Sequence, residues 1–414
     1  MTSRRQPPKV PRPEPVERGE SPTIARIRAA ADPAVAVDQW WSGVQLPLVE
    51  DVGVGGRLLV TFCWRDPDAR QVLLFANRLT DETRLQDSLL ERVPGTNLWH
   101  VGYLMEPDWR ASYSLLVQGR DDLRPPWEQE GDQVSIRTAL DHGHPDPRNP
   151  QTCRNRAGVV QSVAALPQAP GQPWLEERPH VPAGIVTTTT GPLDRTLLTY
   201  ESPGVSGPAP LLLVPDGEVW TSVQSLSVTL DNLVADGVVP PLRAVFLPSG
   251  GRDARWADLG AGDGADAAVT YLAEHLAPDL AARGWLPSPD RVAIVGQSLG
   301  GLTALRMALR HPELCGIALS QSASLWLDDL TADLTGDLPG GRPGERTPPR
   351  IHLAHGRQEW VLAPPHRELA VRLRAVGVDL AEVDHNGGHD YAWWRGAVAD
   401  AVGWAFGSSS DSRT

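Results

Sequence analysis

Residues 186–407 alternate between short, almost wholly apolar segments and amphipathic segments with helical spacing. The apolar segments include APLLLVPDG, LRAVFLPSGG, RVAIVG and CGIALSQSA, and the amphipathic ones include TSVQSLSVTLDNLVADG and AAVTYLAEHLAPDLAARG. A strand that is apolar along its whole length is buried on both faces, which requires helices above and below a parallel sheet. This alternation predicts an α/β domain with a doubly wound, mostly parallel sheet over 186–407.

Residues 36–165 have a different pattern. Short runs rich in Val, Leu, Tyr and Trp, such as RLLVTFCWRD, QVLLFANRL and ASYSLLVQG, are separated by turn segments such as DPDA and VPGTN. Strands at this spacing predict an N-terminal antiparallel β-sandwich. Five prolines within 166–185 indicate a linker or a strap over the domain junction, and six prolines in the first 22 residues favour a disordered arm over 1–35. We also expect the polar tail 408–414 to be disordered.

The segment RVAIVGQSLGG carries the motif G-x-S-x-G, with Ser298 between Gly296 and Gly300. A strand, a sharp turn and a helix are predicted in that order, and this context exposes the serine hydroxyl at the corner. We therefore predict that Ser298 is a nucleophile. The backbone N–H of Leu299, at the start of the helix, is a predicted oxyanion donor.

A nucleophilic serine needs a base and an acid, which follow it in the order acid then histidine in α/β-hydrolases. His389 lies in the glycine-flanked loop NGGHDYAWW after a predicted strand, and it is a better candidate than His385 at the end of that strand. Glu359 lies in the loop GRQEW after the strand RIHLAHG and is the predicted acid. Asp384 is the alternative acid.

Two further loops follow strands on the same predicted edge of the sheet. LLLVPDGEVW supplies a second oxyanion donor, for which we prefer the backbone N–H of Glu218 over that of Gly217. SGGRDARWADL places Arg252 and Arg255 at this rim, where they would either bind an anionic substrate or pair with neighbouring aspartates.

Composition excludes several classes of function. A net charge of −13, from 51 acidic and 38 basic residues, disfavours a nucleic-acid partner. The three cysteines form no C-x-x-C pair, and the sequence has no HExxH motif or His/Cys cluster that would hold a catalytic metal. No run reaches the 18 or so apolar residues of a membrane span, and the N-terminus lacks the apolar core of a signal peptide. We expect a cytoplasmic protein without a membrane partner.

Several motifs together resemble the enterochelin (enterobactin) esterases. The matching motifs are NGGHDYAWWRG, GRQEW, LLLVPDGEVW and RWADL (R-x-x-E-L in the family), with FCWRDP, TNLWHVGYLMEPDWRASYSLL and HPDPRNP in the N-terminal half. The GGHDYAWWRG stretch and the N-terminal segments are the specific parts. The resemblance covers roughly residues 38–407. It implies an α/β-hydrolase domain preceded by the family's N-terminal sandwich domain.

The resemblance also implies a function. Family members hydrolyse the ester bonds of a tris-catecholate trilactone, usually as its iron complex, with a Ser, an acid and a His that match Ser298, Glu359 and His389. Iron then enters with the small-molecule substrate, and no cofactor is expected in the protein. Arginines with aromatic faces suit such a ligand, and the candidates are Arg252, Arg255, Trp220 and Trp393.

Four points stay open. The stretch LGAGDGADAAVTYL after RWADL is smaller and more acidic than in the family, so a different catecholate or a mixed-ligand siderophore is an alternative substrate. A generic carboxylesterase of feruloyl, acetyl or thioester type uses the same serine chemistry. A non-catalytic siderophore- or glycan-binding protein is the alternative from another class. The sequence leaves the oligomeric state undetermined.

Overall fold

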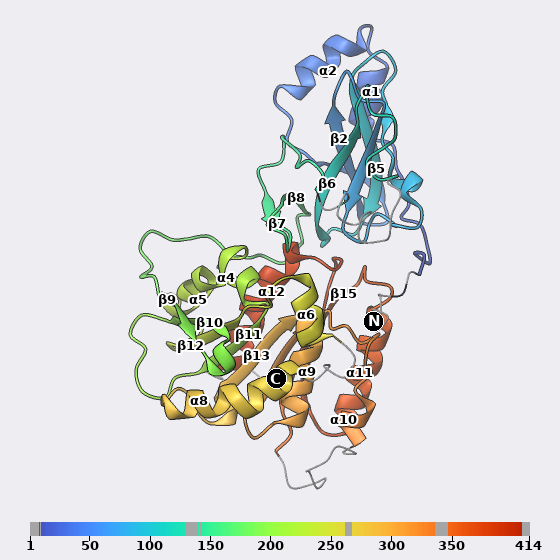
Figure 1. Cartoon of the computed structure of the whole chain (residues 1–414). Helices are drawn as coiled ribbons and strands as arrows, with labels where there is room; N and C mark the ends of the chain where they lie inside the picture. Colours follow the sequence, from blue (N-terminus) through green and yellow to red (C-terminus); the bar gives the residue numbers. More distant parts are fainter. Residues whose placement is uncertain are drawn as a thin grey trace.

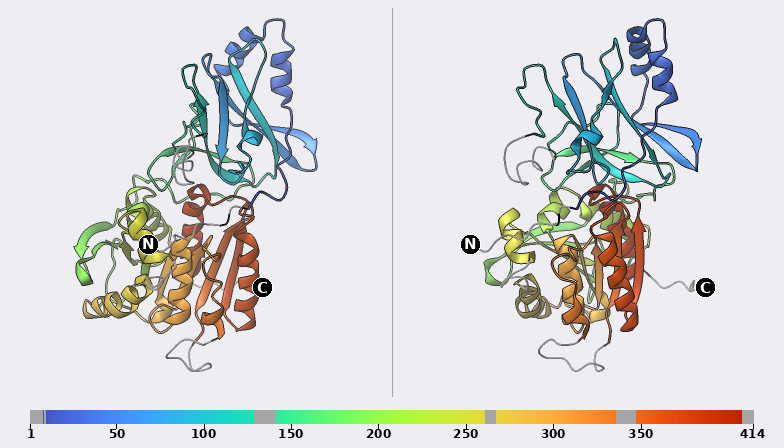
Figure 2. Two further views of the ribbon diagram at one scale, coloured as in Figure 1. Left: turned by 45° about the vertical axis from the view of Figure 1, so that its right-hand side comes forward. Right: turned by 90° about the vertical axis from the view of Figure 1, so that its right-hand side faces the viewer.

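The computed structural model describes residues 8, 10–128, 140, 142–260, 267–335 and 347–407. Figure 1 shows a β-sandwich stacked on one end of a larger α/β part, and both views in Figure 2 show the same arrangement. The tail 408–414, for which we predicted disorder, lies outside the described residues. Within these residues no helix is long and apolar enough to cross a membrane.

Two four-stranded antiparallel sheets form the sandwich, as predicted. Its core includes Phe62, whose ring packs edge-on against Trp109 and Tyr113, so Trp109 is a core residue. One sheet contains, in spatial order, β1 (Leu48–Val54), β2 (Arg57–Arg65), β5 (Leu98–Met105) and β4 (Glu91–Arg92). The other contains β3 (Gln71–Ala76), β6 (Arg110–Gln118), β8 (Val160–Ala165) and β7 (Thr152–Arg154), and the short helix η1 (Leu85–Ser88) follows β3 in the chain.

The second half of the predicted disordered arm is ordered, so the prediction for 1–35 is wrong there. Two helices occupy it, α1 (Pro22–Arg28) and α2 (Pro33–Trp41). A proline at the first position of a helix loses no hydrogen bond, and the preceding Ser21 and Asp32 side chains cap the helices. Ile24 and Ile27 are buried in a cluster with Cys63 of β2 and Leu98 of β5. These prolines start helices rather than prevent them.

The α/β part contains one eight-stranded sheet, and it has the predicted mostly parallel character. Only the pairings of β10 with β9 and with β12 are antiparallel. The spatial order is β16 (Asp379–His385), β15 (Arg350–Gly356), β14 (Ile317–Gln321), β13 (Val292–Gln297), β11 (Leu211–Pro215), β12 (Arg243–Leu247), β10 (Thr196–Glu201) and β9 (Ile185–Thr190).

Helices cover both faces of this sheet. Successive side chains of a strand point to opposite faces, and in the central strands the side chains on both faces are apolar. Leu212 and Val214 of β11 pack into the cluster formed with α5 (Leu226–Ala235) and α12 (Tyr391–Phe406), whereas Leu211 and Leu213 pack on the other face. That other face is covered by α9 (Leu299–Arg310), α11 (Ala363–Ala375), η3 (Tyr271–Leu276) and α8 (Ala277–Ala282). The shorter helices are α4 (Gly217–Ser222), α6 (Arg252–Leu259), α7 (Ala267–Thr270), α10 (Thr331–Thr335), η2 (Pro192–Asp194) and η4 (Pro289–Arg291).

The proline-rich segment 166–185 runs along both parts of the molecule. Leu166 donates its backbone N–H to the Trp109 carbonyl in the sandwich, and the Gln172 amide donates to the Ala392 carbonyl on α12. Further along, the Trp174 indole donates to the Asp236 carboxylate after α5. The segment therefore ties the sandwich to the face of the sheet that α5 and α12 cover.

Candidate active site

Ser298 lies at a sharp corner between β13 and α9. Its backbone has φ +58° and ψ −115°, a conformation that costs energy for a residue with a side chain. A Cβ on Gly296 would lie only 2.2 Å from the carbonyl oxygen of Gly300, which explains the glycine before the serine. Gly300 is less constrained, because a Cβ there would meet Pro215 at an ordinary 3.6 Å. The corner thus requires Gly296 chiefly so that the helix backbone can approach it.

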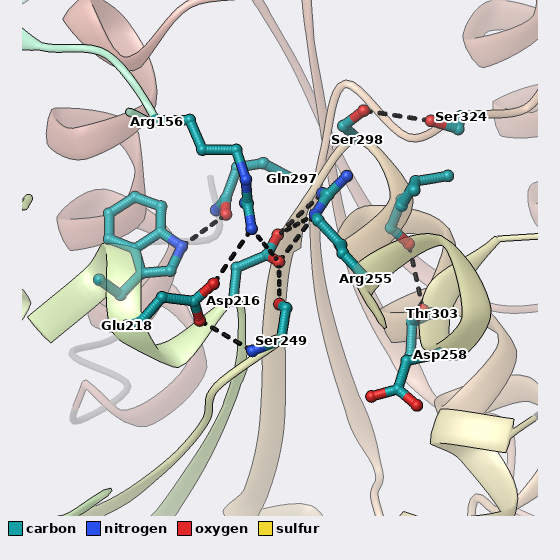
Figure 3. Close-up of polar contacts among 12 residues, drawn as sticks. Arg156, Asp216, Glu218, Ser249, Arg255, Asp258, Gln297, Ser298, Thr303 and Ser324 are labelled. Atoms are coloured by element: carbon teal, nitrogen blue, oxygen red, sulfur yellow. Dashed lines mark hydrogen bonds and ion pairs between the residues drawn. The ribbon is translucent and has the colours of Figure 1, made fainter. Parts of the chain in front are cut away.

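The hydroxyl of Ser298 lies beside the loop that follows β14. Its Oγ is 3.2 Å from Oγ of Ser324, and the Ser324 backbone N–H donates to the Ser298 carbonyl at 3.0 Å (Figure 3). Ser324 did not emerge from the sequence. The signal was present, because β14 pairs in parallel with β13 and the loop after it must emerge at the same edge.

His389 and Glu359 meet at this edge, from the loops after β16 and β15. Nδ1 of His389 is 2.5 Å from Oε1 of Glu359. The other carboxylate oxygen accepts hydrogen bonds from the Gly356 backbone at 2.7 Å and from the Ser322 hydroxyl at 2.6 Å. The carboxylate is buried, with 1% of Glu359 exposed.

The surroundings of Glu359 keep it ionised. Burial alone would raise the pKa of its carboxyl, but the hydrogen bond and charge of His389, with the hydrogen bonds from Ser322 and Gly356, lower that pKa to about 2. Ser322 in turn accepts a hydrogen bond from the Trp394 indole at 3.0 Å, and the Trp394 ring packs edge-on against the His389 ring. The hydrogen bond at Nδ1 and the packing of Trp394 therefore fix the orientation of the His389 ring. Nε2 is then the nitrogen that can exchange a proton with a partner.

The two predicted oxyanion donors lie at helix starts. Leu299 is the first residue of α9, and Glu218 is the second residue of α4. The first N–H groups of a helix have no acceptor within it. Asp216 before α4 has φ +59°, and a Cβ on Gly217 would lie 2.6 Å from the backbone nitrogen of Leu247, so the turn depends on this glycine.

A buried charge cluster supports the Glu218 turn (Figure 3). Arg255 donates from Nε and Nη2 to the Asp216 carboxylate at 2.8 Å each, and the Ser249 hydroxyl donates to Oδ1 at 2.5 Å. Nη2 of Arg156 lies 3.1 Å from Asp216 and 3.2 Å from Glu218. Burial would raise the pKa of Asp216, but Arg255, Arg156 and Ser249 hold it well below its usual range.

The structure bears differently on the four residues predicted to contact substrate: Arg255 is paired, Arg252 stays a prediction, and Trp220 and Trp393 are buried. Arg255 is engaged with Asp216 and its side chain is only 14% exposed, so it serves first as a buried counter-ion. Arg252 is exposed in the first turn of α6, outside the charge cluster. Trp220 and Trp393 are 1% and 3% exposed and belong to the core. Their indoles donate within the protein, to Gln297 and to the Gly388 carbonyl, so the prediction that these two rings contact a ligand is wrong.

Two other tryptophans, not predicted from the sequence, are better exposed near the start of α9, where Ser298 lies. Trp256 on α6 and Trp326, two residues after Ser324, are partly buried and pack edge to face with their ring centroids 6.3 Å apart. Trp256 lies within the RWADL motif, but no periodicity distinguishes an exposed indole from a buried one in a chain with 15 tryptophans.

Comparison with known proteins accounts for both parts of the chain. Residues 59–175 match the family described as "Enterochelin esterase, N-terminal", and residues 195–405 match "Putative esterase". The iron(III) enterobactin esterase of Dickeya dadantii (strain 3937) is 30% identical over 418 residues, covering 90% of this chain and 94% of that protein. The iron(III) salmochelin esterase of Escherichia coli O6:H1 is 30% identical over 406 residues, covering 92% of this chain and 97% of that protein.

Solved structures agree with the sequence comparison. The ferric enterobactin esterase of Salmonella typhimurium superposes with a TM-score of 0.74 at 25% identity, covering 89% of this chain and 98% of that one. The enterobactin esterase of Shigella flexneri, crystallised in the presence of enterobactin, gives a TM-score of 0.71 at 25% identity, covering 89% and 97%. The fold and the family predicted from the sequence are confirmed, and the chain belongs to the enterochelin esterase family.

Proposed function

We propose that this protein hydrolyses the ester bonds of a catecholate siderophore trilactone such as enterobactin, in the cytoplasm. The observation that carries the proposal is the strained Ser298 corner at the same sheet edge as the buried His389–Glu359 pair, in a chain of the enterochelin esterase family. Cutting the trilactone would weaken its hold on iron. Iron enters as part of the substrate, and the proposal includes no resident cofactor.

In the proposed reaction, Nε2 of His389 takes the proton from Ser298 as Oγ attacks the ester carbonyl. The ionised Glu359 stabilises the imidazolium that forms, because its carboxylate faces Nδ1 at 2.5 Å. The backbone N–H groups of Leu299 and Glu218 are the proposed donors to the oxyanion.

The tetrahedral intermediate then collapses. The C–O bond to the leaving serine hydroxyl of the trilactone breaks, and His389 returns the proton to that oxygen. Water attacks the acyl-enzyme in the second half, again with His389 as base, and a carboxylate product leaves. Repetition on the linear product would give shorter fragments.

For the substrate wall we propose Trp256 and Trp326 in place of the buried indoles. Each keeps part of its ring exposed, and Trp326 is two residues from Ser324, which contacts the nucleophile. Their rings, inclined at 62° to each other, offer a face and an edge to a catechol. The Arg255 charge, being offset by Asp216, contributes to the site chiefly by holding the turn.

A chromatographic assay with ferric and iron-free enterobactin tests the proposal. Wild-type protein should release linear trimer, then dimer and monomer, and Ser298→Ala should lower the rate by about 10⁴-fold or more. Trp326→Ala should raise KM for the siderophore while leaving hydrolysis of a small aryl ester intact. Cleavage of the aryl ester with the trilactone untouched would favour a generic carboxylesterase. Binding of the siderophore without any turnover would favour the non-catalytic alternative.

A further inference from the structure

The sandwich domain is hydrogen-bonded to the residue that we propose as the base. The Asn77 side chain, just after β3, donates from Nδ2 to the backbone carbonyl of His389 at 2.9 Å. Contact is close beside it, since a Cβ on Gly388 would lie 2.5 Å from Oδ1 of Asn77 and 2.6 Å from Cγ of Arg78. The glycine lets the histidine loop lie directly on the sandwich.

Two more hydrogen bonds attach the same loop at its ends. The backbone N–H of Arg110, at the start of β6, donates to the Asn386 carbonyl at 2.8 Å. The backbone N–H of Ser112 donates to the Asp390 carboxylate at 2.5 Å, and the other oxygen of Asp390 caps α12. The sandwich therefore contacts the loop 386–390 before, at and after His389.

The oxyanion turn receives a side chain from the sandwich as well. Arg156 lies in the loop between β7 and β8 and crosses to the α/β part, where its Nη2 bridges the carboxylates of Asp216 and Glu218 (Figure 3). These two residues flank Gly217 at the start of α4. The arginine thus joins both sides of the turn that presents the Glu218 N–H.

The loop that carries Glu359 is the third segment of the site that contacts the N-terminal half of the chain. Arg12, whose backbone N–H is bonded to Asp81 of the sandwich, donates from Nη2 to Gln358 at 2.6 Å. Its guanidinium also lies 5.4 Å from the Trp360 ring centroid. Both partners adjoin Glu359, so the histidine loop, the oxyanion turn and the Glu359 loop each contact the N-terminal half of the chain.

We propose that the sandwich is a working part of the catalytic centre, in which Asn77 holds the histidine loop and Arg156 holds the oxyanion turn as positioning residues. The proposal rests on the proposed roles of Ser298 and His389. A displacement of about 1 Å in a catalytic group can cost about 100-fold in rate. Loops gain such precision from rigid elements packed against them. Here those elements belong to the other domain.

The rate at which a fluorophosphonate labels Ser298 tests this in the full chain. The probe requires an activated serine and oxyanion donors, and it is independent of the natural substrate. Asn77→Ala and Arg156→Ala should each slow labelling about tenfold or more. The matched controls are Asn97→Ala and Arg120→Ala, at the end of the sandwich remote from the catalytic loops. Asn97 is hydrogen-bonded to Arg65, and Arg120 is paired with Asp68. They should label within about twofold of wild type.

Conservative variants separate positioning from packing. Asn77→Asp keeps the size but loses the donor to the His389 carbonyl, so it should label slowly, whereas Arg156→Lys keeps the charge and should label faster than Arg156→Ala. Near-UV circular dichroism checks that each variant is folded. Folded Asn77→Asp and Arg156→Ala proteins that label at the wild-type rate would overturn the proposal. Wild type that labels readily but leaves enterobactin intact would refute the substrate assignment alone, and unlabelled wild type would refute both.

Discussion

Nδ1 of His389 lies 2.5 Å from Oε1 of Glu359, although the two residues are 30 positions apart in the chain. The carboxylate is buried and its pKa is lowered to about 2, so it is ionised at neutral pH. Its remaining oxygen is occupied by Ser322 and Gly356. The geometry fits the acid of a catalytic triad, which orients the histidine and stabilises its charged form.

We predict that Glu359→Gln lowers kcat/KM by about 10²–10⁴-fold, because the neutral amide neither fixes the tautomer of His389 nor stabilises the imidazolium. Asp384→Asn is the control. Asp384 is a neighbouring acidic residue whose side chain is 53% exposed. Its carboxylate has a distant ion-pair partner, with Oδ2 4.0 Å from Nε of Arg357. Ester hydrolysis by the two purified variants checks the assignment, and the opposite ranking would make Asp384 the acid.

Arg255→Met should destabilise the fold, because it removes the bidentate partner of the buried Asp216 carboxylate. Leaving one member of a buried ion pair without its partner costs about 3–5 kcal/mol of folding free energy. Because Arg156 and Ser249 still bind the Asp216 carboxylate, we expect a loss of about 3 kcal/mol. The exposed Arg252, changed to Met, should shift the free energy of unfolding by no more than about 0.5 kcal/mol. Urea unfolding measures both. Unchanged stability with weaker siderophore binding would restore the substrate role for Arg255.

The two glycines of the serine motif should respond differently to alanine. Gly296→Ala places a methyl group 2.2 Å from the Gly300 carbonyl oxygen and should abolish activity or folding. Gly300→Ala meets no atom closer than 3.6 Å and lies in the first turn of a helix, where alanine is favourable. Expression level, thermal midpoint and fluorophosphonate labelling would report the difference. Equal tolerance at both positions would show that the corner relaxes more easily than its geometry implies.

Much of this architecture was predictable because it rests on local patterns. The alternation of apolar and amphipathic segments specified the sheet, the G-x-S-x-G motif pointed to Ser298, and chain order with loop position pointed to Glu359 and His389. Parallel strands bring such loops to one edge whatever their separation in sequence. The helices in the N-terminal arm are hidden in the sequence because a high proline content is typical of disorder, whereas Pro22 and Pro33 occupy first helical positions.

What failed depended on contacts between distant segments. Trp220 and Trp393 are predicted ligand contacts because aromatic faces suit a catecholate, but tertiary packing turns both indoles into the core. The contact of Arg156 with Glu218 spans 62 positions and a domain boundary, so no local pattern marks it. No periodicity records a side chain that crosses between domains.

Three histidines around the sheet, of which His352 and His366 are buried and His385 is partly buried, predict acid sensitivity of the fold. Burial lowers the pKa of His352, His366 and His385 from 6.5 to about 4. The folded protein keeps these rings neutral down to about pH 4, whereas the unfolded chain takes up protons near pH 6.5. Because the unfolded state then binds more protons, the free energy of unfolding should fall as the pH drops from 6.5 towards 4.

The slope should be at most about 1.4 kcal/mol per pH unit for each ring. His352→Phe keeps an aromatic ring against Trp404 but cannot titrate, so it should flatten the fall. The exposed His180, changed to Gln, should leave the slope as it is. Urea unfolding at pH 7.5, 6, 5, 4 and 3 measures the slope in both windows. The lowered pKa of Glu359 acts in a separate window, since its contribution is lost only as the pH falls from about 4.5 to about 2. A pH profile that is flat above 4.5 and steep below it would therefore assign the acid sensitivity to the carboxylates instead of the histidines.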